Sequence, residues 1–544
     1  MTAMSYSHGA HDVPLIGDTI GADFERVAAR FADRDALVSR HQDERLTYEQ
    51  LDAAVDAVAS ALLREGVQAG DRVGIWSPNC TEWVLVQYAT AKVGAILVNV
   101  NPAYRSHELE YVLRQSGARL LFSASAFKSS DYRATINEVR GDLDGLRRVV
   151  FVDDDEWTAE FRSGERDRDA IAARMASLSF DDPINIQYTS GTTGFPKGAT
   201  LSHHNILNNG FFVTELLSLT EADRTCLPVP FYHCFGMVMG NLGTLSHGAC
   251  VVIPAPAFEP RATLEAVAAE RVTSLYGVPT MFIAMLAHED FDSFDLTSLR
   301  TGIMAGSPCP IEVMKKVVER MHMDEVSICY GMTETSPVST QTRVDDPLER
   351  RVGSVGRTAP HVEVKVVDPV TGLVVPRGEP GELCTRGYSV MLGYWEDPDR
   401  TAEAIDRARW MHTGDLATMD DEGYLNIVGR SKDMVIRGGE NVYPREIEEF
   451  LYMHPDVEDV QVVGVPDEKY GEELCAWVIA RSGAALEEDA VREFCRGRLA
   501  HFKVPRYVFL TDAFPMTVTG KVQKYKMREA SLERLGLREA APTA

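Results

Sequence analysis

Apolar residues in the first hundred positions alternate between a helical spacing and short continuous runs. Between positions 51 and 62 they recur every three or four residues, the period of one helix face. These residues are Leu51, Val55, Val58 and Leu62. Thr47 and Gln50 have the spacing of a capping box at the start of this helix. Gly66 then ends it.

Two short apolar runs follow, and each has the length and composition of a buried strand. They are Val73–Trp76 and Ile96–Val100, and a helical stretch beginning at Glu82 separates them. Strands alternating with helices favour a parallel sheet covered by helices. The first half of the chain is therefore predicted to have an α/β fold.

The last hundred-odd residues have a different pattern. Pro444 is placed as the first residue of a helix, and Val460–Val465 and Leu474–Ala480 resemble strands. A further amphipathic helix is expected from the apolar residues between Val491 and Leu499. We expect a small α+β unit of roughly 110 residues, which is large enough to fold alone. It is joined to the rest near the polar stretch 429–433.

Composition and charge narrow the classes of partner. The chain has 544 residues, of which 45% are hydrophobic and 25% charged, as in a globular protein with a large core. The 81 acidic residues outnumber the 55 basic ones, and the net charge is −26. Such a field repels nucleic acid and anionic membranes. A small anion such as a nucleotide needs only a few donors and is still compatible with this charge.

The nine cysteines are scattered and include no C-x-x-C pair, which favours buried, reduced thiols in a reducing compartment. No basic residue precedes Arg26, so no signal peptide is expected. The uncharged stretch Cys226–Phe258 is interrupted by prolines and glycines and is not expected to span a membrane. We therefore predict a cytoplasmic protein.

A loop rich in glycine and hydroxyl residues carries the strongest chemical signal. Tyr188–Ala199 contains three glycines, four hydroxyl side chains and Lys197, after the strand-like Ile184–Gln187 and before a helix expected around Asn205. Glycines let the backbone approach an anion, and the hydroxyls and the lysine supply donors and charge. This is the composition of a phosphate-binding loop, although the Walker A spacing is absent.

This loop resembles the signature of the adenylate-forming enzymes, which include acyl-CoA synthetases, peptide-synthetase adenylation domains and beetle luciferases. Seven further segments resemble motifs of the same family in the same order, and the resemblance covers about residues 20 to 540. These segments are Phe231–Gly236, Ala305–Pro308, Tyr330–Thr335, Trp410–Asp415, Gly429–Asp433, Arg437–Pro444 and Pro515–Lys521.

The resemblance implies an architecture. It consists of a large N-terminal adenylation domain at residues 1–429, with parallel sheets, helices and a small β-barrel. A hinge at 430–433, which includes Lys432, would join it to a mobile α+β C-terminal domain at 434–544.

The resemblance also implies where ATP is bound. Asp415 would accept the ribose hydroxyls, Tyr330 would stack on adenine, and Thr333 would contact the α-phosphate. Arg430 would hold ribose or phosphate. The other nucleotide contacts implied are Thr189, Ser190, Gly191, Thr192, Thr193, Gly194, Phe195, Pro196, Lys197, Gly306, Ser307, Pro308, Gly331 and Met332.

Catalysis is assigned by the same resemblance. Lys521 would bridge the substrate carboxylate and the phosphate, neutralising two anions that must approach each other. Glu334 would help to hold Mg²⁺, a hard cation that prefers oxygen ligands. His233 would be the gate between acyl pocket and thiol tunnel, and Thr189 would act within the loop.

A second half-reaction is implied, in which coenzyme A attacks the acyl-adenylate. A thiol of pKa about 8.5 is already partly ionised at neutral pH, so no strong base is required. Gly438 and Gly439 resemble the segment that approaches the pantetheine chain.

The chain is most similar to medium-chain acyl-CoA synthetases, which implies an ATP-dependent fatty acid–CoA ligase that forms AMP. This likeness rests on residues 381–395, 428–434 and 501–505. Alternative substrates are aryl or branched acids. Alternative functions are an enzyme that loads a separate carrier protein, a luciferase-like oxidase, and a homologue that only binds nucleotide or acyl groups. The sequence does not fix the oligomeric state, and a homodimer is one possibility.

Overall fold

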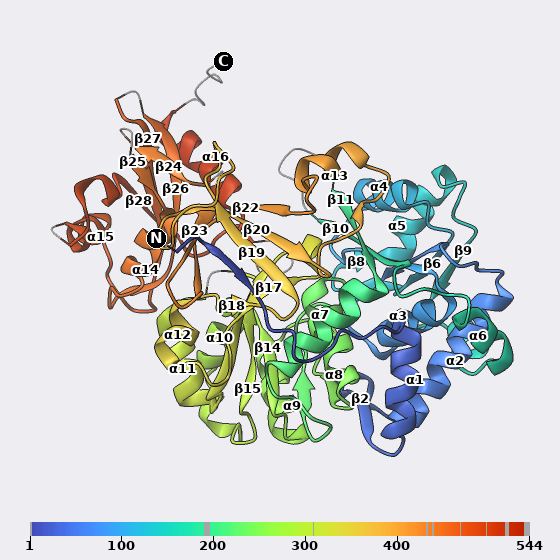
Figure 1. Cartoon of the computed structure of the whole chain (residues 1–544). Helices are drawn as coiled ribbons and strands as arrows, with labels where there is room; N and C mark the ends of the chain where they lie inside the picture. The colour runs from blue at the N-terminus through green and yellow to red at the C-terminus, as the bar shows by residue number, and fades with distance from the viewer. Residues whose placement is uncertain are drawn as a thin grey trace.

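The computed structural model describes residues 3–189, 196–307, 309–430, 433–437, 440–467, 469–496, 498–516 and 522–537, with the backbone alone at Arg430, Glu440 and Asn441. Two large sheets and the helices around them form most of the molecule (Figure 1). A separate small sheet near the C-terminus lies at one end. The predicted α/β fold is confirmed.

The first large sheet has seven strands, and its centre is parallel. In spatial order the strands are β21 (Gly393–Tyr394), β11 (Lys197–Ser202), β10 (Pro183–Thr189), β5 (Ile96–Asn99), β4 (Arg72–Trp76), β6 (Leu120–Ser123) and β9 (Arg148–Phe151). The two predicted strands at 73–76 and 96–100 are β4 and β5.

The second large sheet has nine strands, of which the central six run parallel. In order they are β18 (Arg357–Thr358), β17 (Val338–Gln341), β16 (Glu325–Gly331), β15 (Thr301–Ala305), β14 (Ser274–Gly277), β12 (Arg224–Cys226), β13 (Cys250–Ile253), β2 (Asp35–Ser39) and β3 (Glu44–Thr47).

Helices cover these sheets in layers. The hydrophobic core shared by the two sheets includes buried residues of α1 (Ile20–Arg30), α2 (Tyr48–Arg64), α3 (Thr81–Val93), α7 (His203–Glu215), the π-helix η4 (Phe235–Leu242) and α8 (Gly243–Ser246). On the seven-stranded sheet, α4 (Ser106–Ser116) and α5 (Tyr132–Val139) form a second core. The remaining helices of this part are α6 (Arg168–Met175), α9 (Pro260–Glu270), α10 (Pro279–Leu286), α11 (Ile311–Met321), α12 (Leu348–Gly353) and α13 (Pro398–Ala404).

Local sequence explains helix α2 well. The capping box of Thr47 and Gln50 is present, and the four predicted apolar residues are fully buried. The helix ends at Arg64, and Gly66 adopts a left-handed backbone with φ of 73°. Each of these features follows from the spacing in the sequence.

A third sheet is antiparallel throughout, and in the described part of the chain it is an open sheet where the resemblance implied a small β-barrel. Its order is β1 (Tyr6–His8), β19 (Val362–Val367), β20 (Gly381–Gly387), β22 (Met411–Met419) and β23 (Leu425–Arg430). Within the described ranges β1 and β23 do not pair with each other, so the sheet is open along that edge.

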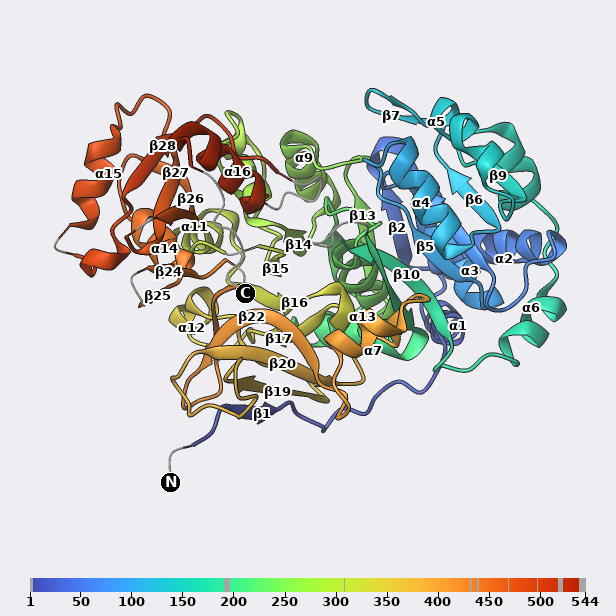
Figure 2. The same ribbon diagram turned by 90° about the horizontal axis from the view of Figure 1, so that it is seen from above.

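The C-terminal residues form their own sheet and cores (Figure 2). Its strands are β25 (Glu440–Val442), β24 (Val435–Arg437), β27 (Gly471–Ala480) and β26 (Val457–Asp467), with β28 (Tyr507–Leu510) also beside β27. One core contains α14 (Pro444–Leu451) and α15 (Glu488–Cys495), and the other contains α16 (Lys524–Leu535). The helix expected to reach Leu499 ends at Cys495 because Arg496 has an extended backbone, with ψ of 134°.

All nine cysteines are buried and none is in a disulfide, as predicted. Among the described helices, none has the length and apolar character that crossing a membrane requires.

Candidate active site

The predicted phosphate-binding loop connects two antiparallel strands. Thr189 ends β10, Lys197 begins β11, and the two residues pair with each other. Of the residues between them, Ser190, Gly191, Thr192, Thr193, Gly194 and Phe195 lie outside the described residues. Pro196 directly precedes β11, and its carbonyl oxygen accepts from the Tyr111 hydroxyl at 3.2 Å.

The helix expected around Asn205 is present as α7 (His203–Glu215), but it does not follow the loop directly. Strand β11 intervenes, and α7 starts only at His203, where Ser202 and Asn205 cap it. Residues 197–202 form a strand because β11 pairs with β10 on one side and with β21 on the other. The positive charge at this loop therefore comes from Lys197, and not from the end of a helix.

Glu334 lies at the base of this loop. It belongs to a short 3₁₀ turn (Thr333–Thr335) that follows β16, and it is only 5% exposed. Its Oε1 accepts hydrogen bonds from the Tyr394 hydroxyl at 2.9 Å and from the Thr189 hydroxyl at 3.4 Å. Three segments far apart in the chain therefore meet at one carboxylate.

Tyr394 is a site residue that the sequence did not identify. Burial, together with the Glu334 carboxylate, raises the pKa of its phenol, so the hydroxyl stays protonated as a donor. Lys197 Nζ lies 5.0 Å from the centre of the Tyr394 ring. Tyr394 comes to this place because β21 pairs with β11, with Tyr394 opposite Ala199.

Asp415 and Tyr330 form a second cluster. The Tyr330 hydroxyl donates to Asp415 Oδ2 at 2.7 Å, and the Asp415 residue is 9% exposed. Arg430 is opposite Asp415 in the β22–β23 register. The residues predicted to contact ribose and adenine are therefore in direct contact with each other.

Gly331 and Gly306 are explained by backbone geometry. Any Cβ on Gly331 would lie 1.9 Å from the carbonyl oxygen of Pro337, so no other residue fits at this bulge in the β16–β17 pairing. Gly306 follows β15 with φ of 90°, which favours glycine. Ser307 is next to it and accepts from the Cys309 thiol through its carbonyl oxygen, at 3.5 Å.

His233 precedes the π-helix η4. The Phe235 amide donates to His233 Nδ1 at 3.2 Å, and Cys234 Sγ lies 3.6 Å from the same nitrogen. Cys234 Sγ is also 3.7 Å from the Thr333 hydroxyl. His233 is therefore connected through Cys234 to the 3₁₀ turn that carries Glu334. Met332 holds that turn as well, because its amide donates to the Thr335 hydroxyl at 3.1 Å.

Several predicted residues cannot be placed. Pro308, Lys432, Gly438, Gly439 and Lys521 lie outside the described residues, and the side chain of Arg430 is not described. The described site thus consists of the Glu334 cluster, the Asp415 cluster and His233.

A buried carboxylate beside a hydroxyl-rich loop, with a second carboxylate against an aromatic ring, defines a class of protein. Together with the two parallel sheets and the separate C-terminal unit, this site is that of an enzyme that adenylates a carboxylate. Comparisons with known proteins agree with this class of enzyme. The family described as "AMP-binding enzyme" matches residues 24–395, and "AMP-binding enzyme C-terminal domain" matches residues 446–521. The chain belongs to the AMP-binding enzyme family, and it is an AMP-forming acyl-CoA synthetase.

Three similar proteins illustrate the match. YngI of Bacillus subtilis (strain 168) is 49% identical, over 96% of this chain and 99% of its own length. The mitochondrial medium-chain acyl-CoA ligase ACSF2 of Rattus norvegicus is 44% identical, over 98% of this chain and 91% of its own length. The crystal structure of the anthranilate CoA ligase AuaEII in complex with anthranoyl-AMP has a TM-score of 0.85 at 28% sequence identity. The match covers 97% of this chain and 99% of that one.

Proposed function

We propose that this enzyme activates medium-chain fatty acids in two steps, first with ATP and Mg²⁺ and then with coenzyme A. The observation that carries the proposal is the meeting of Thr189 and Tyr394 at Glu334, with Lys197 over the ring of Tyr394. It places donors, one cation and one carboxylate beside a loop suited to phosphate.

In the first step, the fatty acid carboxylate attacks the α-phosphorus of ATP and pyrophosphate leaves. Lys197 and the loop hydroxyls would hold the phosphates, and Asp415 would accept hydrogen bonds from the ribose. Tyr330 would pack against adenine while its hydroxyl keeps Asp415 oriented, at 2.7 Å. These residues position the reactants and neutralise charge, which are the main requirements of phosphoryl chemistry.

Glu334 fits the requirements of Mg²⁺. Both of its hydrogen bonds use Oε1, and Oε2 has no hydrogen-bond partner among the described residues. A buried carboxylate oxygen is the hard ligand that Mg²⁺ prefers. When bound, the ion would reduce the negative charge of the phosphates.

The acyl chain is proposed to lie beyond His233. All eight residues of the π-helix η4 are buried and uncharged, and they include Met237 and Met239. Irregular helices of this kind often occur at functional sites, and methionine suits an alkyl chain because it is flexible and apolar. The ACSF2 relative, named as a medium-chain ligase, supports this length.

The proposed second step uses a different arrangement of the two parts of the chain. We propose residues 1–429 as the adenylation domain, 430–433 as the hinge with Lys432, and 434–544 as the mobile domain. The separate C-terminal sheet and cores support these boundaries. Rotation would bring Gly438 and Gly439 to the thiol tunnel and remove Lys521. A cytoplasmic, reducing location is supported by the nine free cysteines.

Pyrophosphate release should depend on chain length. With ATP, Mg²⁺ and acids from acetate to palmitate, we expect turnover to peak at about six to ten carbons and to require coenzyme A, since the pocket must match the alkyl chain. Slow release that is independent of coenzyme A would instead favour the loading of a carrier protein. Absence of release with every acid would contradict the proposal.

Removing the hydroxyl of Tyr394 should slow adenylation. In Tyr394→Phe the ring stays beside Lys197, but Glu334 loses a donor 2.9 Å away. A hydrogen bond to a charged group contributes about 1.5–3 kcal/mol, so we expect a loss of about tenfold or more in pyrophosphate release. The matched control is Tyr525→Phe, because Tyr525 is 58% exposed on α16. Equal rates for the two variants would exclude this role.

A further inference from the structure

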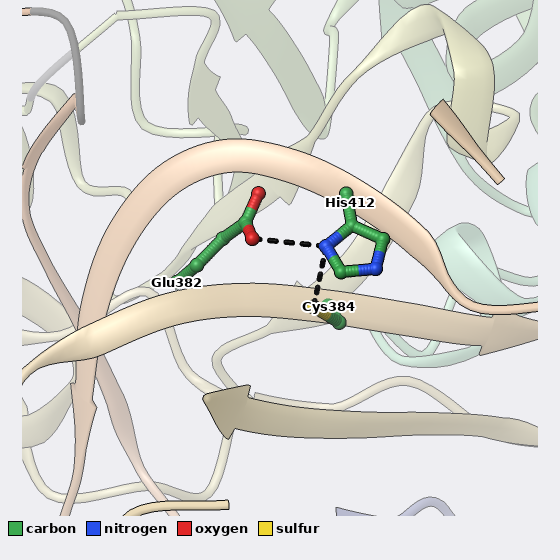
Figure 3. A group of neighbouring side chains, drawn as sticks. All are labelled: Glu382, Cys384 and His412. Carbon is green, nitrogen blue, oxygen red and sulfur yellow. Dashed lines mark hydrogen bonds and ion pairs between the residues drawn. The ribbon is translucent and has the colours of Figure 1, made fainter. Parts of the chain in front are cut away.

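Three potential metal ligands lie together on the antiparallel sheet, outside the proposed catalytic clusters. Glu382 and Cys384 are two positions apart on β20, and His412 on β22 is directly opposite Cys384 (Figure 3). Alternate residues of a strand point to the same face, and a directly opposed residue on the next strand joins them there. This arrangement brings three side chains to one point on a rigid sheet.

The distances between the three side chains suit a cation with tetrahedral coordination. His412 Nδ1 is 2.9 Å from Glu382 Oε2 and 3.5 Å from Cys384 Sγ. The three ligand atoms all lie within 4.8 Å of one another. Ligands at about 2.0–2.3 Å from Zn²⁺ stand roughly 3–4 Å apart in a tetrahedron, so little movement would be needed.

The surroundings resemble those of a metal-bound histidine. The second imidazole nitrogen, Nε2, faces Asp406 Oδ2 at 3.9 Å. Metal-binding histidines commonly direct their other nitrogen at a carboxylate, which fixes the ring and its tautomer. The site reaches solvent on the side of His412 and Glu382, whose side chains are 34% and 17% exposed, while Cys384 is buried beneath them.

A second group of acidic side chains shows why this cluster is different. Glu25, Asp52 and Asp56 also converge, but the ammonium of Lys92 lies among them at 2.7–2.9 Å, and Arg168 pairs with Asp52 and Asp56 as well, so cationic side chains already occupy this cluster. No lysine or arginine forms an ion pair with Glu382 in the described part of the chain. The Glu382 cluster instead combines sulfur, nitrogen and oxygen, the ligand types that zinc uses.

We propose that Glu382, Cys384 and His412 form a binding site for Zn²⁺ or a similar thiophilic divalent cation, with water as the fourth ligand. On binding, the Cys384 thiol releases its proton to solvent and its sulfur binds the ion. The imidazole then carries its proton on Nε2, toward Asp406.

The site is coupled to the residues proposed to bind ribose. Glu382 Oε1 accepts from the Gly414 amide at 3.1 Å, while Oε2 contacts His412. Gly414 is next to Asp415, and Thr413 is tied to β20 through its hydroxyl, which donates to the Leu383 carbonyl at 2.6 Å. An ion here would cross-link β20 and β22 beside Asp415.

The test is a titration of the full-length, reduced protein with Co²⁺, which reports on a bound thiolate by its absorption. We expect sulfur-to-cobalt and d–d bands that saturate at one equivalent and are displaced by Zn²⁺. Zn²⁺ should also raise the Tm. Absence of the sulfur-to-cobalt band in the unmodified protein would overturn the proposal.

Variants locate the site. Cys384→Ser should abolish the sulfur-to-cobalt band, and His412→Gln should remove most of the affinity. Asp406→Asn should weaken binding by about 10- to 100-fold, because the charge facing His412 Nε2 is lost while the amide oxygen can still accept from the Ala408 and Trp410 amides. Cys250→Ser is the matched control, a buried strand cysteine whose loss should leave the band intact. A band that persists in Cys384→Ser would place the cation elsewhere and refute the site.

Discussion

Replacing Lys521 by alanine is expected to lower the rate of acyl-adenylate formation on the order of 10²–10³-fold, as when one preorganised charge stabiliser is removed. The carboxylate and the α-phosphate are both anionic, and Lys521 is the residue proposed to lie between them. Lys521 lies outside the described residues, so this prediction rests on the sequence motif. Thioester formation from pre-made acyl-adenylate should be far less affected, because the lysine is proposed to leave before that step.

The two half-reactions are measured separately, by pyrophosphate release and by acyl-CoA formation from synthetic adenylate. Lys526→Ala is the control, since Lys526 is an exposed lysine on α16. A similar loss in both half-reactions would contradict the proposed rotation of the C-terminal domain.

Replacing Glu334 by glutamine is expected to reduce adenylation by a comparable factor, on the order of 10²–10³-fold. The amide oxygen can still accept from Tyr394 and Thr189, so the fold around the 3₁₀ turn should be preserved. What disappears is the negative charge proposed to bind Mg²⁺. The concentration of Mg²⁺ required for half-maximal rate should therefore rise as well.

The measurement is pyrophosphate release as a function of Mg²⁺, with the Tm recorded to confirm folding. Glu312→Gln on α11 is the control, because its side chain is exposed. An unchanged Mg²⁺ requirement in Glu334→Gln, with a normal Tm, would remove Glu334 from the proposed metal site.

Elements defined by local spacing were predictable from the sequence. The capping box and apolar face of α2, and the short runs that became β4 and β5, depend on neighbours a few positions away. Strand β11 was missed although one partner, β10, precedes it closely in the chain. Its other partner, β21, lies almost 200 positions later, and local pattern carries no information about such a contact.

The same reason applies to the site. Glu334, Asp415 and Tyr330 were identified because each belongs to a recognisable motif. Tyr394 was not, since it becomes a partner of Glu334 only through the β11–β21 pairing. The neighbourhood of Glu382 and His412 was likewise hidden, because an antiparallel register brings together residues 30 positions apart.

Strand β1 makes the N-terminal residues part of the antiparallel sheet, so their removal would change how the molecules associate. Residues 6–8 form the outer strand of the antiparallel sheet and pair with residues 363–365 of β19, and the Tyr6 hydroxyl donates to Glu363 at 2.7 Å. A chain shortened at its N-terminus would leave one edge of β19 unpaired, while its other edge stays paired with β20. Because β19 is rich in valine, this exposed edge would favour association between molecules. The first residues therefore protect the sheet against aggregation.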